Sequence, residues 1–275
     1  MSATALTPDV ISYVCTTVRD RSAIELDASK SYLIEARLAP VAKQNGFASI
    51  ADLIQGVRAK RRPELESRLV EAMTTNETSF FRDMHPFEAL RTKLLPELRV
   101  RNAMRRSLNI WSAACSTGQE IYSVAMHVRE HFPDLASWKV QLIGTDLSDD
   151  VLARARAARF SQIEVNRGLP AALLVKYFQR DGMHWQLRPE LRDMAAFTKL
   201  NLIERWPSLP SMDIVFLRNV LIYFSPETKR AILEKVRKVM APQAVLFLGA
   251  AETTMGLDAC FERVQVDNSV FYRLK

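Results

Sequence analysis

The sequence predicts an α/β protein with a helical N-terminal domain, followed by a mostly parallel sheet that ends in an antiparallel hairpin and carries a small inserted β-subdomain. Residues 1–75 show the apolar spacing of helices and no strand pattern. From residue 108 onward, apolar runs alternate with amphipathic helices, which is typical of a parallel sheet covered on both faces. Residues 261–274 form two alternating runs around Asp267 and Asn268, which predicts the hairpin.

Length and composition suit this class. A chain of 275 residues with 48% hydrophobic and 25% charged residues can form one large domain or two ordinary ones, and it is neither disordered nor fibrous in composition. We expect a helical domain over 1–75, a linker and connecting helix over 76–107, and a sheet domain over 108–275. Within the last part, an inserted subdomain is expected at about 160–195.

The cysteines and the apolar runs indicate a cytoplasmic protein that does not insert into a membrane. Cys15, Cys115 and Cys260 are odd in number and far apart, which favours neither a disulfide framework nor a zinc ribbon. The N-terminus lacks a basic segment followed by an apolar run. The uncharged apolar stretch 240–251 is too short to span a bilayer.

The N-terminal helices have recognisable starts and faces. Thr7 followed by Pro8 predicts a cap and a first helical turn, and an apolar stripe runs from Val10 to Val18. We expect further helices over 28–44, 49–59 and 63–73.

The second part alternates strands and helices. A helix with 3.6-residue periodicity fills the interval between the first two strands. Residues 160–195 interrupt the rhythm, and the run HWQLRPEL at 184–191 suits a short strand and a turn. We expect strands over 109–114, 139–145, 196–202, 212–217 and 244–249.

The net charge of +7 comes from the later part of the chain, because residues 1–85 hold 11 basic and 11 acidic side chains. Basic residues cluster at 58–62 and at 99–106. Such clusters are either solvated helix ends or binding surfaces for an acidic partner. Neither cluster is interleaved with aromatic residues, as single-stranded nucleic acid would favour, so an acidic protein partner is at least as good a hypothesis.

The run WSAACSTGQEIYS at 111–123 combines a strand, a tight turn at 116–118 and a helix start. A turn of this kind brings backbone N–H groups close to a ligand at the carboxyl edge of a sheet. Neither G-x-G-x-x-G nor a P-loop is present, so the sequence does not favour a dinucleotide or a triphosphate.

Asp146 ends the next strand and offers a carboxylate at the same edge. In nucleoside-binding sheets an acidic residue at this place accepts hydrogen bonds from ribose hydroxyls. The alternative role is to cap the following helix, for which Ser148 is an equally good candidate. The turn and the acid together favour a nucleoside without a polyphosphate, which describes S-adenosylmethionine.

Two further motifs flank this site in the sequence. TTNETSFFRD at 74–83 combines a polar cluster with Phe80, Phe81 and Arg82, and it fits a linker that buries its aromatic pair and turns polar groups into a cleft. RNVLIYF at 218–224 follows the fourth strand, again at the ligand-binding edge. Taken singly, each motif is equally consistent with a purely structural loop.

Taken in order behind a helical domain, these motifs with GTD and LNL resemble the CheR-type chemotaxis receptor methyltransferase family over nearly the whole chain. The resemblance implies a Rossmann-like class I methyltransferase sheet. It implies transfer of a methyl group from S-adenosylmethionine to glutamate side chains of chemoreceptor cytoplasmic helices, with S-adenosylhomocysteine as product. The cofactor contacts that it implies are Asn76, Thr78, Arg82, Glu120, Asp146, Asn201, Leu202, Arg218 and Asn219.

The same resemblance assigns catalytic and partner sites. Tyr223 would lie near the transferable methyl group, and Arg82 and Tyr223 would orient the acceptor carboxylate. The inserted subdomain would bind a short tether peptide at the receptor C-terminus. We further expect the basic helices at 58–62 and 99–106 to dock the acidic receptor.

Two departures from the family pattern are visible. Ile121 stands where relatives often have proline, which alters only the helix start. The run GAAE at 249–252 stands where relatives often have Gly-His-Ser-Glu, so no role for a histidine carries over.

Three alternative hypotheses follow from other features. His127 and His131 match a zinc-protease spacing, but no third ligand is evident, so we expect no metal. A nucleic-acid methyltransferase would share the sheet and the cofactor, yet RNVLIYF lacks the proline pair typical of amino-methylating enzymes, so we expect no nucleic acid. A non-catalytic adaptor that binds the cofactor is the third.

Overall fold

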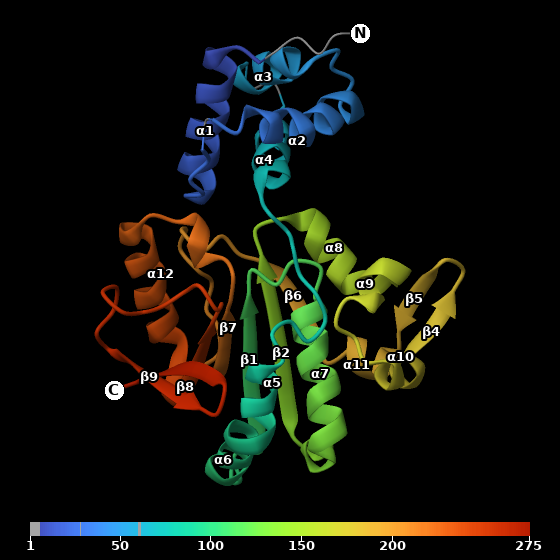
Figure 1. Cartoon of the computed structure of the whole chain (residues 1–275), viewed down its shortest axis with the longest axis vertical. Coiled ribbons are helices and arrows are strands. Elements are labelled where there is room, and N and C mark those ends of the chain that lie inside the picture. Colours follow the sequence, from blue (N-terminus) through green and yellow to red (C-terminus); the bar gives the residue numbers. More distant parts are fainter. Residues whose placement is uncertain (1–5, 28, 60–61) are drawn as a thin grey trace. The chain divides into compact units, whose positions relative to one another are not determined.

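A computed structural model describes residues 6–27, 29–59 and 62–275 of the chain (Figure 1). These residues form two compact units. The first contains the described residues up to Thr75 together with Tyr223–Thr228, and the second contains Asn76–Ile222 and Lys229–Lys275. The short segment Tyr223–Thr228 therefore joins the N-terminal helices, which the prediction of contiguous domains did not include.

The first unit is helical, as the sequence predicts. The side-chain oxygen of Thr7 accepts a hydrogen bond from the N–H of Val10 at 3.4 Å, and Ser49 caps its helix through the N–H of Asp52 at 3.1 Å. The apolar faces pack on one another, with Val14 and Leu38 fully buried. The helices are α1 (Pro8–Ser22), α2 (Ser31–Gln44), α3 (Ile50–Arg58) and α4 (Pro63–Met73).

The second unit is built on a seven-stranded sheet with the order β6-β2-β1-β7-β8-β10-β9. All strand pairs from β6 to β8 are parallel, whereas β10 pairs antiparallel with both β8 and β9. This arrangement confirms the predicted mostly parallel sheet and its C-terminal hairpin. The strands are β1 (Ser107–Ala113), β2 (Lys139–Asp146), β6 (Ala195–Lys199), β7 (Met212–Leu217), β8 (Met240–Leu248), β9 (Phe261–Val266) and β10 (Ser269–Leu274).

Two strand boundaries differ from the prediction by three residues or more. The strand expected over 196–202 ends at Lys199, where the chain turns into the loop that carries Asn201. The strand expected over 244–249 begins at Met240, because a bulge lets it continue past Pro242. At this bulge Gln243 has a φ of +60°. Proline inside a strand is tolerated mainly at such irregularities, and it concealed the start of this strand in the sequence.

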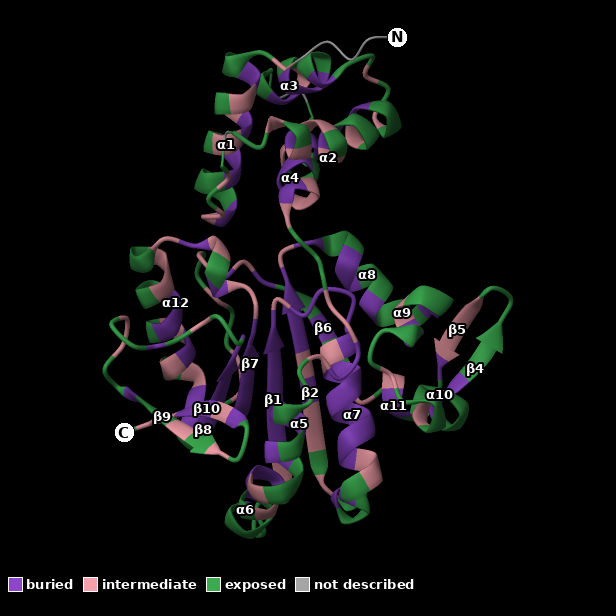
Figure 2. Cartoon of the chain, viewed as in Figure 1, coloured by how far each residue is buried: buried purple, intermediate pink, exposed green. Residues whose placement is uncertain are grey.

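The helices of the second unit cover the sheet and connect it to the segment 74–83. A continuous helical segment contains a π turn in its middle and packs against β10 through its first part. Figure 2 shows β1 and β7 buried along their length, as their apolar runs predict. These helices are α5 (His85–Ala89), η1 (Leu90–Leu94), α6 (Leu95–Arg101), α7 (Gln119–His131), η2 (Pro133–Ser137) and α8 (Asp149–Ala157), and the unit also contains most of η3 (Leu221–Tyr223) and α12 (Pro226–Val239), whose residues within 223–228 belong to the first unit.

The inserted subdomain has its own small antiparallel sheet with the order β3-β5-β4. The run predicted as a short strand and turn is β5 followed by Pro189. Phe80 of the linker packs edge-on against Phe160 of this sheet, with ring centres 5.0 Å apart. Its elements are β3 (Arg159–Ser161), α9 (Gln162–Asn166), α10 (Ala171–Tyr177), β4 (Phe178–Asp181), β5 (His184–Leu187) and α11 (Pro189–Arg192).

Candidate functional site

The turn between β1 and α7 has the conformation of a ligand-binding loop. Ala114, Ser116 and Gly118 have left-handed φ angles of +56°, +50° and +90°. Gly118 is required here, because its φ is unfavourable for other residues and an added Cβ would lie 3.1 Å from the ring of Tyr122. The turn therefore directs the N-terminus of α7 toward the carboxyl edge of the sheet.

Asp146 holds this turn from the end of β2. Its buried carboxylate accepts hydrogen bonds from the N–H of Ser116 at 2.9 Å and from the N–H of Ser148 at 3.1 Å. The side chain of Ser148 caps α8 by accepting from the N–H of Val151 at 3.4 Å. Of the two candidates for the cap of α8, Ser148 is thus the cap, and the carboxylate of Asp146 at the end of β2 binds the turn at Ser116.

Ser116 holds the segment 74–83 against the turn between β1 and α7. Its hydroxyl donates to the carbonyl of Asn76 at 2.8 Å. Farther along this motif, Phe80 and Phe81 are both buried, and the N–H of Phe81 donates to the hydroxyl of Ser123 at 2.9 Å. The predicted linker with a buried phenylalanine pair is therefore confirmed, and it lies against α7. Thr78 is half-buried in the same segment.

Arg218, immediately after β7, connects the motifs by ion pairs. It donates to the carboxylate of Glu120 at 2.8 Å and to that of Asp83 at 2.7 Å, and it also reaches the carbonyl of Arg82 at 3.1 Å. Its side chain is only 2% exposed. Glu120 uses its other oxygen to accept from the hydroxyl of Ser112 at 2.8 Å. Arg218 and Glu120 are thus fixed relative to each other by charge-assisted hydrogen bonds.

Arg82 lies where the linker reverses direction, between Phe81 and Asp83, which both have left-handed φ angles. Its guanidinium donates to the carbonyl of Glu77 at 3.3 Å. A hydrogen bond from Arg167, together with the positive charge of Arg82, lowers the pKa of the Glu77 carboxyl group. The segment around Arg82 is therefore ordered by its own backbone and by the inserted subdomain.

Asn201 and Leu202 lie in the loop after β6, which the N–H of Leu200 ties to the carbonyl of Asp146 at 2.9 Å. The ammonium group of Lys235 on α12 donates to the carbonyls of Leu202, Ile203 and Glu204 at 3.0, 2.8 and 2.7 Å. Burial lowers the pKa of Lys235. Sequence reasoning missed Lys235, because nothing local distinguishes it from the other lysines of an amphipathic helix.

Asn219 follows Arg218 in a left-handed conformation with a φ of +57°, and its N–H donates to the carboxylate of Glu252 at 2.7 Å. Glu252 was also missed as a site residue. Tyr223 falls in the first compact unit, where its carbonyl accepts from the N–H of Glu25 at 3.0 Å.

The structure thus brings most of the predicted residues to the carboxyl edge of β1, β2 and β7, in separate groups of contacts around Asp146, Arg218 and Glu252. In open α/β sheets ligands bind at this edge. Thr78 and Tyr223 are the two predicted residues that the contacts described above do not link to it. The linked residues are Asn76, Arg82, Glu120, Asp146, Asn201, Leu202, Arg218 and Asn219.

In the basic cluster at 58–62 the structure describes Arg58, Ala59 and Arg62. α3 ends at Arg58, which pairs with Asp9 at 2.8 Å. Arg62 pairs with Glu64 at 2.8 Å. Lys60 and Arg61 lie outside the described residues.

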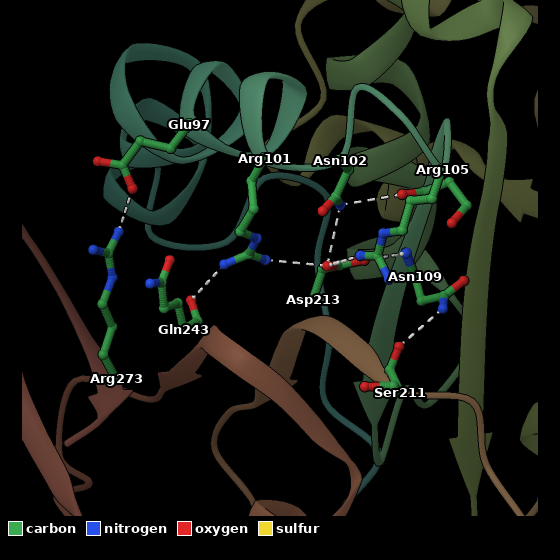
Figure 3. A network of polar contacts seen from close by, with 10 residues as sticks. Glu97, Arg101, Asn102, Arg105, Asn109, Ser211, Asp213, Gln243 and Arg273 are labelled. Carbon is green, nitrogen blue, oxygen red and sulfur yellow. Dashed lines mark hydrogen bonds and ion pairs between the residues drawn. The ribbon is translucent and has the colours of Figure 1, made fainter.

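The basic segment expected to be helical over 99–106 is helical only as far as Arg101, where α6 ends. Its arginines have partners within the chain, and Figure 3 shows those of Arg101 and Arg105. Arg101 and Arg105 both bind the carboxylate of Asp213, which is completely buried. The other two bind farther along the chain, with Arg99 paired to Asp134 at 2.8 Å and Arg106 bound to the hydroxyl of Ser137.

The zinc-like spacing of His127 and His131 has a structural explanation. His127 is buried, and desolvation together with the charge of His131 lowers its pKa to about 3. Among the described residues, no three or more His, Cys, Asp or Glu side chains are placed to hold a metal ion. Burial also raises the pKa of the Cys115 thiol, in keeping with a packing role.

Comparison with known proteins gives the family. Residues 76–270 match the profile described as CheR methyltransferase, SAM binding domain, and residues 10–74 match the one described as CheR methyltransferase, all-alpha domain. The chain belongs to the CheR methyltransferase family. It is therefore a methyltransferase that uses S-adenosylmethionine.

Relatives cover nearly the whole chain. The chemotaxis protein methyltransferase Cher2 of Pseudomonas putida is 39% identical over 92% of this chain and 93% of its own. Chemotaxis protein methyltransferase 1 of Pseudomonas aeruginosa is 41% identical over 92% and 93%. Chemotaxis protein methyltransferase 1 of Vibrio cholerae is 36% identical over the full length of both chains. No helix in the described part of this chain is long and apolar enough to cross a membrane.

Proposed function

We propose that this methyltransferase esterifies glutamate side chains on the cytoplasmic helices of chemoreceptors and thereby serves sensory adaptation in the cytoplasm. The products are glutamate methyl esters and S-adenosylhomocysteine. The observation that carries the proposal is the network in which Arg218 joins Glu120 to the turn at Arg82 and Asp83. The names of its relatives support the chemotaxis role.

The donors and acceptors at the site suit S-adenosylmethionine. The loop at 114–118 has left-handed turns but no phosphate-binding glycine motif, which fits a nucleoside without a polyphosphate. Glu120 offers a nearly buried carboxylate for the cofactor's ammonium group, and Asp146 offers one for the ribose hydroxyls. We assign the remaining contacts to Asn76, Thr78, Arg82, Asn201, Leu202, Arg218 and Asn219.

When bound, S-adenosylmethionine supplies an electrophilic methyl group. The acceptor needs little activation, because a glutamate side chain with a pKa of about 4.3 is already anionic at pH 7. The task of the protein is therefore to orient the acceptor carboxylate, which in favourable cases is worth about 7–11 kcal/mol of the barrier. We assign this orientation to Arg82 and Tyr223. Both must hold the carboxylate loosely, since tight pairing would stabilise the ground state as well.

Three surfaces are proposed for the receptor. The basic segment 58–62 docks acidic receptor helices, and the inserted subdomain binds a tether peptide from the receptor C-terminus. The segment 99–106 also docks acidic receptor helices: its arginines pair within the chain, as Arg58 and Arg62 do, and the side chains of Arg99 and Arg105 remain 43% and 42% exposed. The acceptor is a protein rather than a nucleic acid, since the 218–224 motif carries no proline pair.

Base lability of the transferred methyl group tests the reaction. Receptor-containing membranes are incubated with labelled S-adenosylmethionine and then treated briefly with alkali. Release of the label as methanol is expected, because carboxyl esters hydrolyse in base. Label that survives alkali would indicate methylated nitrogen and overturn the proposal. Absence of label despite tight binding of S-adenosylhomocysteine would favour the adaptor hypothesis.

A further inference from the structure

The carboxylate of Glu252 binds three backbone N–H groups from two separate segments. One oxygen accepts from Gly249 and from Asn219, both at 2.7 Å, and the other accepts from Ile222 at 3.2 Å. The N–H of Glu252 donates back to the carbonyl of Gly249 at 2.9 Å. One side chain thus joins the end of β8 to the segment 218–222 that follows β7, and we call this arrangement the Glu252 clasp.

The segment that the clasp holds is conformationally demanding. Asn219 has a φ of +57°, a left-handed conformation that costs free energy for any residue with a Cβ, although asparagine tolerates it better than most. A cavity of about 390 Å³ lies beside the clasp and is lined by Arg218, Gly249 and Glu252 among others. Leu221 of the same segment is buried, so packing on one side and the hydrogen bonds of the clasp beside the cavity together fix the segment.

Gly249 makes the close approach possible. A Cβ at this position would lie 2.6 Å from the amide nitrogen of the Asn219 side chain, 2.7 Å from the carboxylate of Glu252 and 2.9 Å from the backbone nitrogen of Asn219. Such a Cβ would displace both sides of the clasp. Gly249 is therefore needed for space, and it gives a second, independent way to disturb the same contacts.

We infer that Glu252 is a positioning residue for methyl transfer. By binding the three N–H groups it sets the direction in which Asn219 projects and the backbone from which Tyr223, the next residue after Ile222, continues. This inference rests on the proposed function, in which Asn219 contacts the cofactor and Tyr223 orients the acceptor carboxylate. A carboxylate suits the task because both of its oxygens accept, whereas an amide would turn one NH₂ group toward an N–H.

The test uses Glu252→Gln in the full chain, with methylation of receptor membranes and calorimetry of S-adenosylhomocysteine as separate readouts. We expect kcat to fall by about 10- to 100-fold, because small misplacements of reacting groups cost this much. We expect the affinity for S-adenosylhomocysteine to fall by only about 3- to 10-fold, in line with one weakened polar contact. The KM for the receptor is expected to stay unchanged, since docking surfaces lie elsewhere.

Gly249→Ala serves as the second variant and Glu234→Gln as the control. Gly249→Ala is expected to give the same pattern, and the double variant is expected to be no worse than the poorer single variant, because both changes disturb one arrangement. Glu234 is exposed and pairs with Lys238 at 2.7 Å, so its change is expected to leave both readouts intact. Wild-type kcat and affinity in either clasp variant would overturn the inference.

The two proposals fail in different ways. A wild-type protein that methylates no receptor would refute the proposed function. The affinities of wild type and variants for S-adenosylhomocysteine would then still show whether the Glu252 clasp positions Asn219 for the cofactor. If Glu252→Gln does not fold, Gly249→Ala decides. A parallel fall of kcat, affinity and melting temperature in both variants would show that the clasp is merely structural.

Discussion

The strand β7 has a buried charge at each end, and the two ends differ in what they do. Asp213, near the amino end, is completely buried and binds Arg101, Arg105, Asn102 and the N–H of Asn109 (Figure 3). Its partners bring the end of α6 and the start of β1 together. At this edge of the sheet the ion pairs serve the fold.

Arg218, just past the carboxyl end of β7, is a buried base bound by acids, whereas Asp213 is a buried acid bound by bases. Arg218 is 2% exposed and binds two carboxylates, Glu120 and Asp83, the second of which is about half exposed. The same physical requirement, that a buried charge be paired, is met at both ends. Because ligands bind at the carboxyl edge of such sheets, only the pairing around Arg218 is placed to shape a site. Position in the sheet, rather than the kind of interaction, separates the two roles.

The largest effect is expected from Asp213→Ala. Removal of the carboxylate leaves two arginines without their partner, and breaking a buried ion pair costs about 3–5 kcal/mol. Urea denaturation should show this loss in the free energy of unfolding. Calorimetry of the folded variant should give an unchanged affinity for S-adenosylhomocysteine, and a tenfold weaker affinity would break the distinction between the two ends of β7.

Arg218→Met is expected to give the opposite pattern. We predict that the affinity for S-adenosylhomocysteine falls at least about tenfold, which corresponds to about 1.4 kcal/mol. The accompanying loss of stability comes mainly from Glu120, which is 14% exposed and loses its ion-pair partner, because Asp83 can turn to water. A variant that binds as well as wild type but unfolds far more easily would assign Arg218 to the fold instead.

Arg82→Ala sharpens the comparison within the site itself. Its backbone carbonyl is held by Arg218, but its guanidinium binds only the carbonyl of Glu77 among the contacts described. We expect kcat to fall by about 10-fold or more and the affinity for S-adenosylhomocysteine to change by less than about threefold, because orientation of the acceptor is lost. Full turnover with purified receptor would remove Arg82 from the catalytic residues.

His127 differs from Asp213 and Arg218 because its burial favours the neutral form of the side chain, which makes a smaller, pH-dependent contribution to stability. Its pKa in the folded protein is about 3, below the ordinary value of 6.5, so the unfolded chain binds the extra proton between these values. Stability contributed by neutral His127 is therefore lost as pH falls through this window, by up to about 1.4 kcal/mol per pH unit.

His127→Phe should remove that slope from the free energy of unfolding measured between pH 6 and pH 4. His85→Gln, an exposed histidine, provides the control and should leave the slope as in wild type. Identical slopes in His127→Phe and wild type would show that His127 is already protonated in the folded protein.

Much of the fold could be predicted because periodicity and capping are local. Thr7 and Ser148 cap the helices that follow them, and the C-terminal hairpin turns between Val266 and Ser269. The bulge near Pro242 was missed, since proline breaks the local strand pattern that the partner strand restores.

The site was predictable only in part, for a related reason. Glu120 follows a recognisable turn and Asp146 ends a recognisable strand, so their place at the sheet edge follows from the sequence. Glu252 and Lys235 act through backbone groups that are 30 or more residues away in the sequence, and no local pattern records such contacts. The partner of Arg101 and Arg105 could not be predicted for the same reason, because Asp213 lies over 100 residues away from both.

The grouping of Tyr223–Thr228 with the N-terminal helices has a consequence for how this family can recombine. The first compact unit consists of two separate stretches of chain. A chimaera of two family members joined once, after Thr75, would therefore combine α1–α4 of one protein with the 223–228 segment of the other. Chimaeras that exchange both stretches together should express and function better than those that exchange the N-terminal stretch alone. In genomes, substitutions around Glu25 and in 223–228 should accordingly change in concert.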